Sequence, residues 1–222
     1  MKTKKPQASP FRNLGRLIED HFKKGLNKVE EIFKDTRAAD DKLFSYFRVF
    51  IDDKGVASVT PSSRYLIERV MKAMDVRNAH QVVEYGAAEG VMTRRILDRM
   101  PSNGRILAIE LNEKLFKSLK CINDPRLIAY RGDARDVGAL AKKFGLDKVD
   151  VVVSGIPFAF LSRDGRHELL SDTARVLRPG GRFVAYQVTT HLIHPLNEHF
   201  SRVKTEFEIR NIPPNFIFTA FK

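Results

Sequence analysis

The residues best suited to chemistry in this chain are acids that end successive apolar segments. Glu84 ends the first segment, Glu110 ends the second, and Asp133 follows the third. A turn from Gly86 to Gly90 follows Glu84, and its backbone can approach a ligand closely because glycine has no Cβ atom. An acid at the spacing of Glu110 from Gly86 is placed to hold ribose hydroxyls. The pattern therefore predicts a nucleotide-type cofactor site at the carboxyl ends of parallel strands.

Alternating strands and helices must position these acids. From Gln81 onward the pattern predicts such elements in turn at 81–85, 91–100, 105–111, 113–121, 127–131, 136–144, 149–154, 165–177 and 181–189. The alternation indicates right-handed crossovers and an α/β fold with helices on both faces of the sheet. After a short helix at 194–200, strands at 203–210 and 215–221 are joined tightly enough to be antiparallel. We expect a seven-stranded, mostly parallel sheet with a C-terminal antiparallel hairpin.

Composition places the chain among globular proteins that meet an anionic partner. Its 222 residues suffice for one compact domain, and a formal net charge of +12 indicates either nucleic acid or an anionic membrane surface. The single cysteine, Cys121, excludes an internal disulfide and fits a reducing compartment. The chain shows neither the roughly 20 apolar residues that span a bilayer nor the apolar core of a signal peptide. We therefore expect a soluble or peripheral protein that is not exported.

The N-terminal segment has the pattern of a basic amphipathic helix. Apolar residues recur at helical spacing: Phe11, Leu14, Ile18, Phe22, Leu26, Val29 and Phe33. Up to Lys28 the other positions hold eight basic residues against two acids. Such a helix can lie in the headgroup plane of a membrane, so residues 1–35 are predicted to bind an anionic membrane surface through residues 11–33. The alternative is a helix packed on the catalytic core with a solvated basic face.

Two more helices are expected before the sheet. Asp40 or Asp41 can cap a helix over 42–51, and Thr60 can cap another in which Pro61 takes the first position.

Five motifs in order resemble those of class I S-adenosylmethionine (SAM) methyltransferases. They are the glycine-rich turn, the acid at 110, the run RGDA at 131–134, the strand and loop at 149–158, and the run RPGG at 178–181 before a late strand. The resemblance spans roughly residues 60–222. It implies a Rossmann-like fold with SAM as cofactor and S-adenosylhomocysteine as product. The methyltransferase domain would then occupy residues 36–222, with lid or substrate helices at 40–75.

A closer resemblance is to the bacterial phospholipid N-methyltransferases. It rests on the stretches FIDDKGVASVTPSSR, VVSGIPFAFLS, RVLRPGGRFVAYQ and EIRNIPPNFIF. It implies stepwise methylation of phosphatidylethanolamine towards phosphatidylcholine, at the cytoplasmic face of the inner membrane, with no nucleic-acid partner. The turn departs from the Gly-Pro-Gly-Thr-Gly of that family: Ala88 replaces the middle glycine, and Glu89 adds a negative charge beside the methionine end of the cofactor.

The resemblance also implies which residues hold the cofactor. They cluster at strand ends and comprise Glu84, Gly86, Ala88, Gly90, Glu110, Leu111, Asp133, Ala134 and Ser154. Glu84 would lie near the ammonium group, Glu110 would accept from the ribose diol, and Asp133 would accept from the adenine amino group. The alternatives are a Glu84 paired with a lysine or arginine, and acids that merely end strands in solvent.

The residues expected at the methyl acceptor are Ser154, Gly155, Ile156, Phe158 and Tyr186. Carbonyl groups of the loop and the Ser154 hydroxyl can accept from the amine and orient its lone pair. Phe158 can stack beside the forming ammonium, and Tyr186 is a second aromatic candidate and a possible proton acceptor. The alternative for both aromatic residues is a place in the core.

A phospholipid also needs a site for its phosphate. The candidates are Ser62, Ser63, Arg64 and Arg210, which combine hydroxyls with guanidinium groups. The alternative is that Ser62 and Ser63 only cap a helix. The spacing of His191, His194 and His199 does not predict a metal site, and we expect none.

Two other functions share this fold. An RNA adenine N6-methyltransferase would suit the basic charge, but such enzymes place Asn or Asp where this chain has Ser154. A non-catalytic membrane-binding module is the third reading, favoured by Ala88 and Glu89. The oligomeric state and the number of methyl groups added stay open.

Overall fold

The computed structural model describes residues 62–158, 161–211 and 214–222. The predicted helices at 11–33 and 42–51, and the predicted cap at Thr60 and Pro61, lie outside these ranges, as does the membrane-binding segment 1–35. Among the described residues, no helix is long and apolar enough to cross a membrane.

Within the described residues, seven strands form one sheet in the order β3-β2-β1-β4-β5-β7-β6. The strands are β1 (Gln81–Tyr85), β2 (Arg105–Glu110), β3 (Leu127–Arg131), β4 (Val149–Ser154), β5 (Leu177–Gln187), β6 (Arg202–Glu208) and β7 (Asn215–Phe221). The first five are parallel, and β7 runs antiparallel between β5 and β6. This topology confirms the predicted mostly parallel sheet with its C-terminal hairpin.

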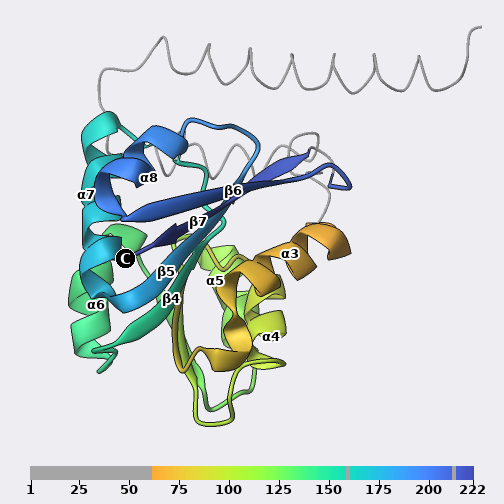
Figure 1. Cartoon of the computed structure of the whole chain (residues 1–222). Coiled ribbons are helices and arrows are strands. Elements are labelled where there is room, and N and C mark those ends of the chain that lie inside the picture. The colour runs from red at the N-terminus through yellow and green to blue at the C-terminus, as the bar shows by residue number, and fades with distance from the viewer. Residues whose placement is uncertain (1–61, 159–160, 212–213) are drawn as a thin grey trace, which may run out of the picture. The chain divides into compact units, whose positions relative to one another are not determined.

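Helices cover both faces of this sheet (Figure 1). They are α3 (Arg64–Met74), α4 (Val91–Leu97), α5 (Glu113–Lys120), α6 (Val137–Lys143), α7 (Arg163–Val176) and α8 (Ile193–His199), with 3-10 turns η1 (Val76–Asn78) and η2 (Ala134–Asp136). One large core cluster joins α6, α7 and α8 to the sheet, and a second joins α3 and α4 to its other face. The central strands are therefore apolar on both sides, as their near-continuous runs of valine and isoleucine require.

Helix α3 begins later than its sequence pattern suggested. Ser63 is its N-cap, and the Ser63 hydroxyl accepts a hydrogen bond from the amide of Leu66 at 3.2 Å. Ser62 and Ser63 are not helical, so the predicted start of this helix at position 61 is wrong. The backbone amide of Ser63 donates to the side-chain oxygen of Asn211 at 2.7 Å, which fixes the start of α3 against the turn between β6 and β7.

The strand directions determine which edge of the sheet carries the turn between β6 and β7. Gln187 at the end of β5 pairs with Phe216 near the start of β7, and Phe216 pairs with Phe207 near the end of β6. The turn between β6 and β7 thus lies at the carboxyl edge of the parallel strands. This is the edge at which ligands bind in open α/β sheets.

Candidate active site

The glycine-rich turn leaves β1 and is fastened to the neighbouring strand. The amides of Gly86 and Ala87 both donate to the carbonyl of Ile109 in β2, at 2.9 and 3.2 Å. Gly86 has a φ of 70°, and a Cβ atom there would lie 3.0 Å from Cγ2 of Ile156. Gly86 therefore combines a left-handed backbone, which favours glycine, with a close contact to the loop after β4 that leaves little room for a Cβ atom.

Ala88, in the middle of this turn, also has a left-handed backbone, with a φ of 50°. Gly90, the last residue of the turn, has a φ of 83° and precedes α4. A residue with a Cβ atom loses roughly 1–2 kcal/mol in this conformation. The alanine at position 88 therefore places strain in the turn.

Glu110 ends β2 and is held by the turn itself. Its Oε2 accepts from the amide of Ala88, and its Oε1 accepts from the amide of Asn112, both at 2.7 Å. The side chain is buried, and burial raises the pKa of Glu110, while the amides of Asn112, Ala88 and Leu111 act in the opposite direction. The carboxylate is thus fixed in position beside the glycine-rich turn, with further lone pairs available for two hydroxyl donors.

Glu84, one strand away, lies in a drier environment. The carboxyl group accepts a hydrogen bond at 2.6 Å from the hydroxyl of Thr93 in α4, and no lysine or arginine among the described residues pairs with it. Burial raises the pKa of Glu84 to about 8, and the charge of Glu110 contributes in the same direction. A cationic group placed here would favour the ionised carboxylate, because an opposite charge lowers the pKa of an acid.

Asp133 follows β3 and completes the row of acids. Its carboxylate accepts from the amide of Arg135 at 2.8 Å and forms an ion pair with the same residue at 2.8 Å. Asp133 also caps the 3-10 turn that starts at Ala134, a buried residue. The acid is partly occupied by Arg135, so an adenine amino group would have to use a remaining acceptor position.

The loop after β4 lies directly against the glycine-rich turn. Ser154 is fully buried, and its hydroxyl accepts from the amide of Ile156 at 3.3 Å. A Cβ atom on Gly155 would lie 2.5 Å from the hydroxyl oxygen of Tyr186. The structure therefore brings together Ser154, Gly155, Ile156 and Tyr186 as predicted, at the junction of β1, β4 and β5.

The environment of Tyr186 bears on its predicted role as a proton acceptor. Burial and the nearby charge of Glu84 both raise the pKa of the Tyr186 phenol. The group therefore stays a neutral hydroxyl at physiological pH. A neutral hydroxyl can accept a hydrogen bond from an amine and orient it, but it is a poor base.

Phe158 does not occupy the predicted place beside the acceptor. Its side chain is 1% exposed and packs edge-on against Phe183, with the ring centroids 5.9 Å apart. This residue belongs to the core between the sheet and α7, and we correct the predicted cation–π role. A polar neighbour that the sequence reading missed is Gln187, whose buried amide nitrogen donates to the carbonyl of Ile156 at 2.8 Å.

The predicted phosphate residues divide into capping and cationic groups. Ser63 caps α3, which removes its hydroxyl from the candidates, while Ser62 lies half-buried just before it. The guanidinium carbons of Arg64 and Arg210 lie 4.8 and 4.1 Å from the ring centroid of Tyr65. The structure thus brings Arg64 and Arg210 together around one aromatic ring.

Arg210 has a second partner in Glu208. Its Nε and Nη2 atoms donate to the two carboxylate oxygens of Glu208, each at 2.8 Å. This contact lowers the pKa of Glu208 to about 2, with help from Arg69. Nη1 of Arg210 is not part of the pair, so the guanidinium group is held in place with one nitrogen outside it.

The hydrogen-bond acceptors at this edge of the sheet fit SAM. The ammonium, ribose diol and adenine amino group of SAM are hydrogen-bond donors, and the site offers three carboxyl groups at the ends of three adjacent strands, Glu84, Glu110 and Asp133. The order β3-β2-β1 places them in one row, with the glycine-rich turn at the β1 end and beside the loop after β4. Leu111 lies half-buried next to Glu110, where a ribose or adenine ring would pack.

Comparisons with known proteins agree with this geometry. Residues 82–181 match the family described as "Methyltransferase domain". The ornithine lipid N-methyltransferase of Singulisphaera acidiphila is 28% identical over 170 residues, which cover 75% of this chain and 88% of that protein.

Two solved structures illustrate the likeness of fold. The 1,6-didemethyltoxoflavin-N1-methyltransferase of Burkholderia thailandensis, with bound S-adenosylhomocysteine, has a TM-score of 0.57 at 17% identity, covering 99% of this chain and 93% of that one. The N-methyltransferase NodS of Bradyrhizobium japonicum, also with S-adenosylhomocysteine, has a TM-score of 0.59 at 12% identity, covering 80% and 96%. The fold is a Rossmann-like methyltransferase fold, the chain is a SAM-dependent methyltransferase, and its cofactor is SAM.

Proposed function

We propose that this SAM-dependent methyltransferase methylates the amine of phosphatidylethanolamine, and then its mono- and dimethyl products, at the surface of a membrane. The observation on which the proposal mainly rests is the character of the carboxyl edge of the sheet. Among the described residues, the large apolar side chains that are exposed are Val91, Val188, Phe207 and Ile209. All four lie at that edge, where the chain enters α4, leaves β5 or reaches the end of β6.

An apolar rim of this kind suits a lipid acceptor. Ile209 is 71% exposed and stands next to Arg210 in the turn after β6. Apolar side chains can enter the acyl boundary of a bilayer while neighbouring arginines stay with the phosphates. The rim therefore favours an acceptor that is presented by a membrane over one that diffuses freely in water.

The amine would be oriented by the loop after β4. SAM, when bound, supplies a methyl group on a sulfonium, and the acceptor nitrogen must present a lone pair to it. The carbonyls of Ser154–Ile156 and the Tyr186 hydroxyl are acceptors that can hold the hydrogens of a neutral amine. These groups give alignment, and the proton that the nitrogen loses on methylation passes to water.

The headgroup phosphate would lie between Arg64 and Arg210. Both guanidinium groups converge on Tyr65, and Ser63 and Asn211 tie the start of α3 to the turn after β6. A phosphodiester accepts charge-assisted hydrogen bonds from guanidinium groups. In this proposal residues 11–33 bring the enzyme to anionic lipid at the cytoplasmic face of the inner membrane.

A second candidate acceptor is an ornithine lipid, because the relative with 28% identity is named for that substrate. An ornithine lipid presents an amine to the same loop but has no phosphodiester. The two candidates therefore differ in their need for the arginine pair. Phosphatidylethanolamine should depend on Arg64 and Arg210, and an ornithine lipid should depend on them much less.

A test with isotopically labelled SAM separates the candidates. The full chain is incubated with vesicles of phosphatidylethanolamine and phosphatidylglycerol, with vesicles that contain ornithine lipid, or with ribosomal RNA. We expect label in phosphatidylethanolamine, and a lower rate in the variant Arg64→Gln. Label in RNA alone would contradict the proposal. Label in ornithine lipid alone would show that the acceptor is ornithine lipid and not phosphatidylethanolamine.

A further inference from the structure

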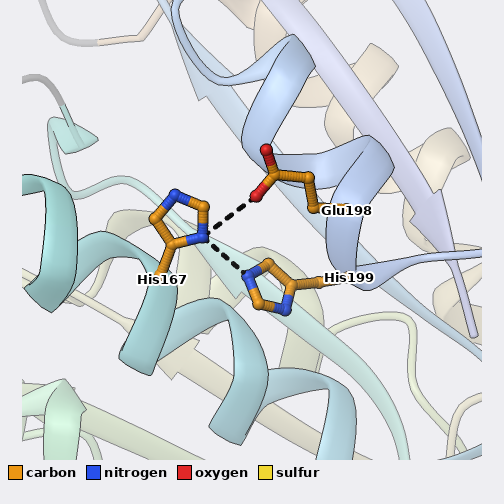
Figure 2. A group of neighbouring side chains, drawn as sticks. All are labelled: His167, Glu198 and His199. Atoms are coloured by element: carbon orange, nitrogen blue, oxygen red, sulfur yellow. Dashed lines mark hydrogen bonds and ion pairs between the residues drawn. The ribbon is translucent and has the colours of Figure 1, made fainter.

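The side chains of two histidines and one glutamate, which belong to two different helices, lie close together beside the sheet (Figure 2). His167 belongs to α7, and Glu198 and His199 end α8. Nδ1 of His167 lies 3.1 Å from Nε2 of His199 and 3.2 Å from Oε2 of Glu198. We propose that His167, Glu198 and His199 form a Zn²⁺ site that links α7 to α8.

The spacing of the ligand atoms fits a zinc ion. Zinc binds imidazole nitrogen and carboxylate oxygen at roughly 2.0–2.2 Å, so two ligands of a tetrahedral site are about 3.3 Å apart. Strand β5 separates the helices that carry His167 and His199 along the chain, yet their ligand atoms and that of Glu198 all lie within 4.8 Å of one another. Two histidines and one glutamate are a familiar zinc ligand set, with the fourth position left for water.

The backbones that carry these ligands are held by the core. His167 is followed on α7 by Leu169 and Leu170, both fully buried. His199 is followed by Phe200, whose ring stacks on Phe183 with centroids 6.0 Å apart. The site therefore needs only small side-chain movements to close around an ion.

A third histidine, His194, contacts the carboxylate of Glu198 from outside the proposed site. Nδ1 of His194 lies 2.7 Å from Oε1 of Glu198, the carboxylate oxygen that does not face His167. Such an outer contact orients a ligating carboxylate.

Metal binding also changes a hydrogen position. Two ring nitrogens at hydrogen-bond distance imply that one of them bears a hydrogen, and zinc needs a lone pair on both. A neutral His167 can move its hydrogen from Nδ1 to Nε2 through solvent, so the ring binds zinc without net loss of a proton. His199 then bears its hydrogen on Nδ1, and Glu198 binds as the carboxylate.

This site differs from the methyl-transfer site and would act on the structure around it. Helix α7 follows the loop that begins at Ser154, and α8 follows the strand that ends with Tyr186 and Gln187. Zinc would hold the two helices, and with them the ends of these two loops, in one arrangement. The inference does not depend on the identity of the methyl acceptor.

Calorimetric titration of the full, chelator-treated chain with zinc chloride tests the site. We expect one zinc ion per chain, and a loss of affinity of roughly 100-fold or more in His167→Asn and in Glu198→Gln, with roughly tenfold loss in His194→Asn. His191→Asn and Cys121→Ser are matched controls, because both side chains are exposed and lie outside the cluster. Zinc should also raise the unfolding temperature of the unaltered chain but not that of His167→Asn.

Two results would overturn the site. One is zinc affinity in His167→Asn and Glu198→Gln equal to that of the unaltered chain, or loss of binding in a control variant instead. Circular dichroism and S-adenosylhomocysteine binding establish that each variant is folded. The second result needs no variant: the Co²⁺-substituted full chain should show the intense visible absorption of a tetrahedral site, and a weak octahedral spectrum would exclude it.

Discussion

Glu84 is the residue whose ionisation the fold alters most directly. Its carboxyl is buried and hydrogen-bonded to Thr93, and the folded protein raises its pKa to about 8 from an unfolded value near 4.3. The folded state therefore retains a proton that the unfolded chain has lost between these two values. The stabilisation that this proton gives is complete below the unfolded pKa and is lost as the pH rises through about 8.

The variant Glu84→Gln isolates this effect, because glutamine resembles the protonated acid and does not titrate. The unfolding free energy of the unaltered chain, minus that of Glu84→Gln, should fall as the pH rises, by at most about 1.4 kcal/mol per pH unit between roughly pH 5 and pH 8. Urea unfolding at a series of pH values measures it. Parallel stability curves for the two proteins would show that Glu84 is not protonated in the empty site.

Ala88 is the residue at which this turn departs from glycine. Replacing it by glycine removes the cost of a left-handed alanine, roughly 1–2 kcal/mol, and adds an entropic cost of roughly 0.5–1 kcal/mol. We expect Ala88→Gly to leave stability unchanged or raise it by up to about 1.5 kcal/mol. Ala87→Gly is the matched control, since Ala87 is buried without a positive φ and should lose stability. Equal losses in both variants would contradict strain at Ala88.

At the scale of elements, the loop after β4 and the end of β5 form one unit. A Cβ atom on Gly155 would lie 2.5 Å from the hydroxyl oxygen of Tyr186, so Gly155→Ala must displace that hydroxyl. We expect Gly155→Ala and Tyr186→Phe to lower turnover roughly 10- to 100-fold while the dissociation constant of SAM changes little, because displacement of an orienting group acts on alignment. Steady-state kinetics and calorimetry give the two quantities.

A control for this loop is available in α6. A Cβ atom on Gly138 would meet nothing within 4 Å, so Gly138→Ala makes the same substitution without a collision. It should keep full turnover. If Gly155→Ala behaves like Gly138→Ala, the Tyr186 hydroxyl has no part in orienting the acceptor.

The sequence was a good guide to elements with strong apolar periodicity. The strands β1 and β2, which carry Glu84 and Glu110, are where their valine and isoleucine runs placed them, because central parallel strands are buried on both faces. It was a poor guide where a distant residue decides. The start of α3 depends on Asn211, whose side-chain oxygen accepts a hydrogen bond from the amide of Ser63. The burial of Phe158 depends on Phe183, against which its ring packs. The approach of His167 to His199 likewise depends on packing between helices.

At the scale of the whole molecule, charge and apolar surface are both expected to act in membrane binding. The chain has a net charge of +12, and each basic residue near an anionic surface contributes about 1 kcal/mol at low ionic strength. We expect the full chain to sediment with phosphatidylglycerol vesicles, less so at high salt, and a chain without residues 1–33 to sediment much less. The truncated chain should still bind SAM. Equal sedimentation would assign membrane binding to another part of the molecule.

The rim at the carboxyl edge makes a separate prediction. Ile209→Ser should weaken vesicle binding even at high salt, because it removes apolar rather than charged contact, and Ile209→Leu should not. Ile209 is 71% exposed, so neither variant disturbs the core. Vesicle binding by Ile209→Ser equal to that of Ile209→Leu would indicate that the rim stays in water.

The most direct measurement of the central claim is the lipid composition of a bacterial host that makes phosphatidylethanolamine but no phosphatidylcholine. Mass spectrometry of its lipids after expression of the full chain should show phosphatidylethanolamine with one, two and three added methyl groups. The same host with Glu110→Ala should show none, because that variant lacks the carboxylate proposed to hold the ribose of SAM. An unchanged lipid composition, with the folded and SAM-binding protein present in the cells, would contradict methylation of phosphatidylethanolamine by this enzyme.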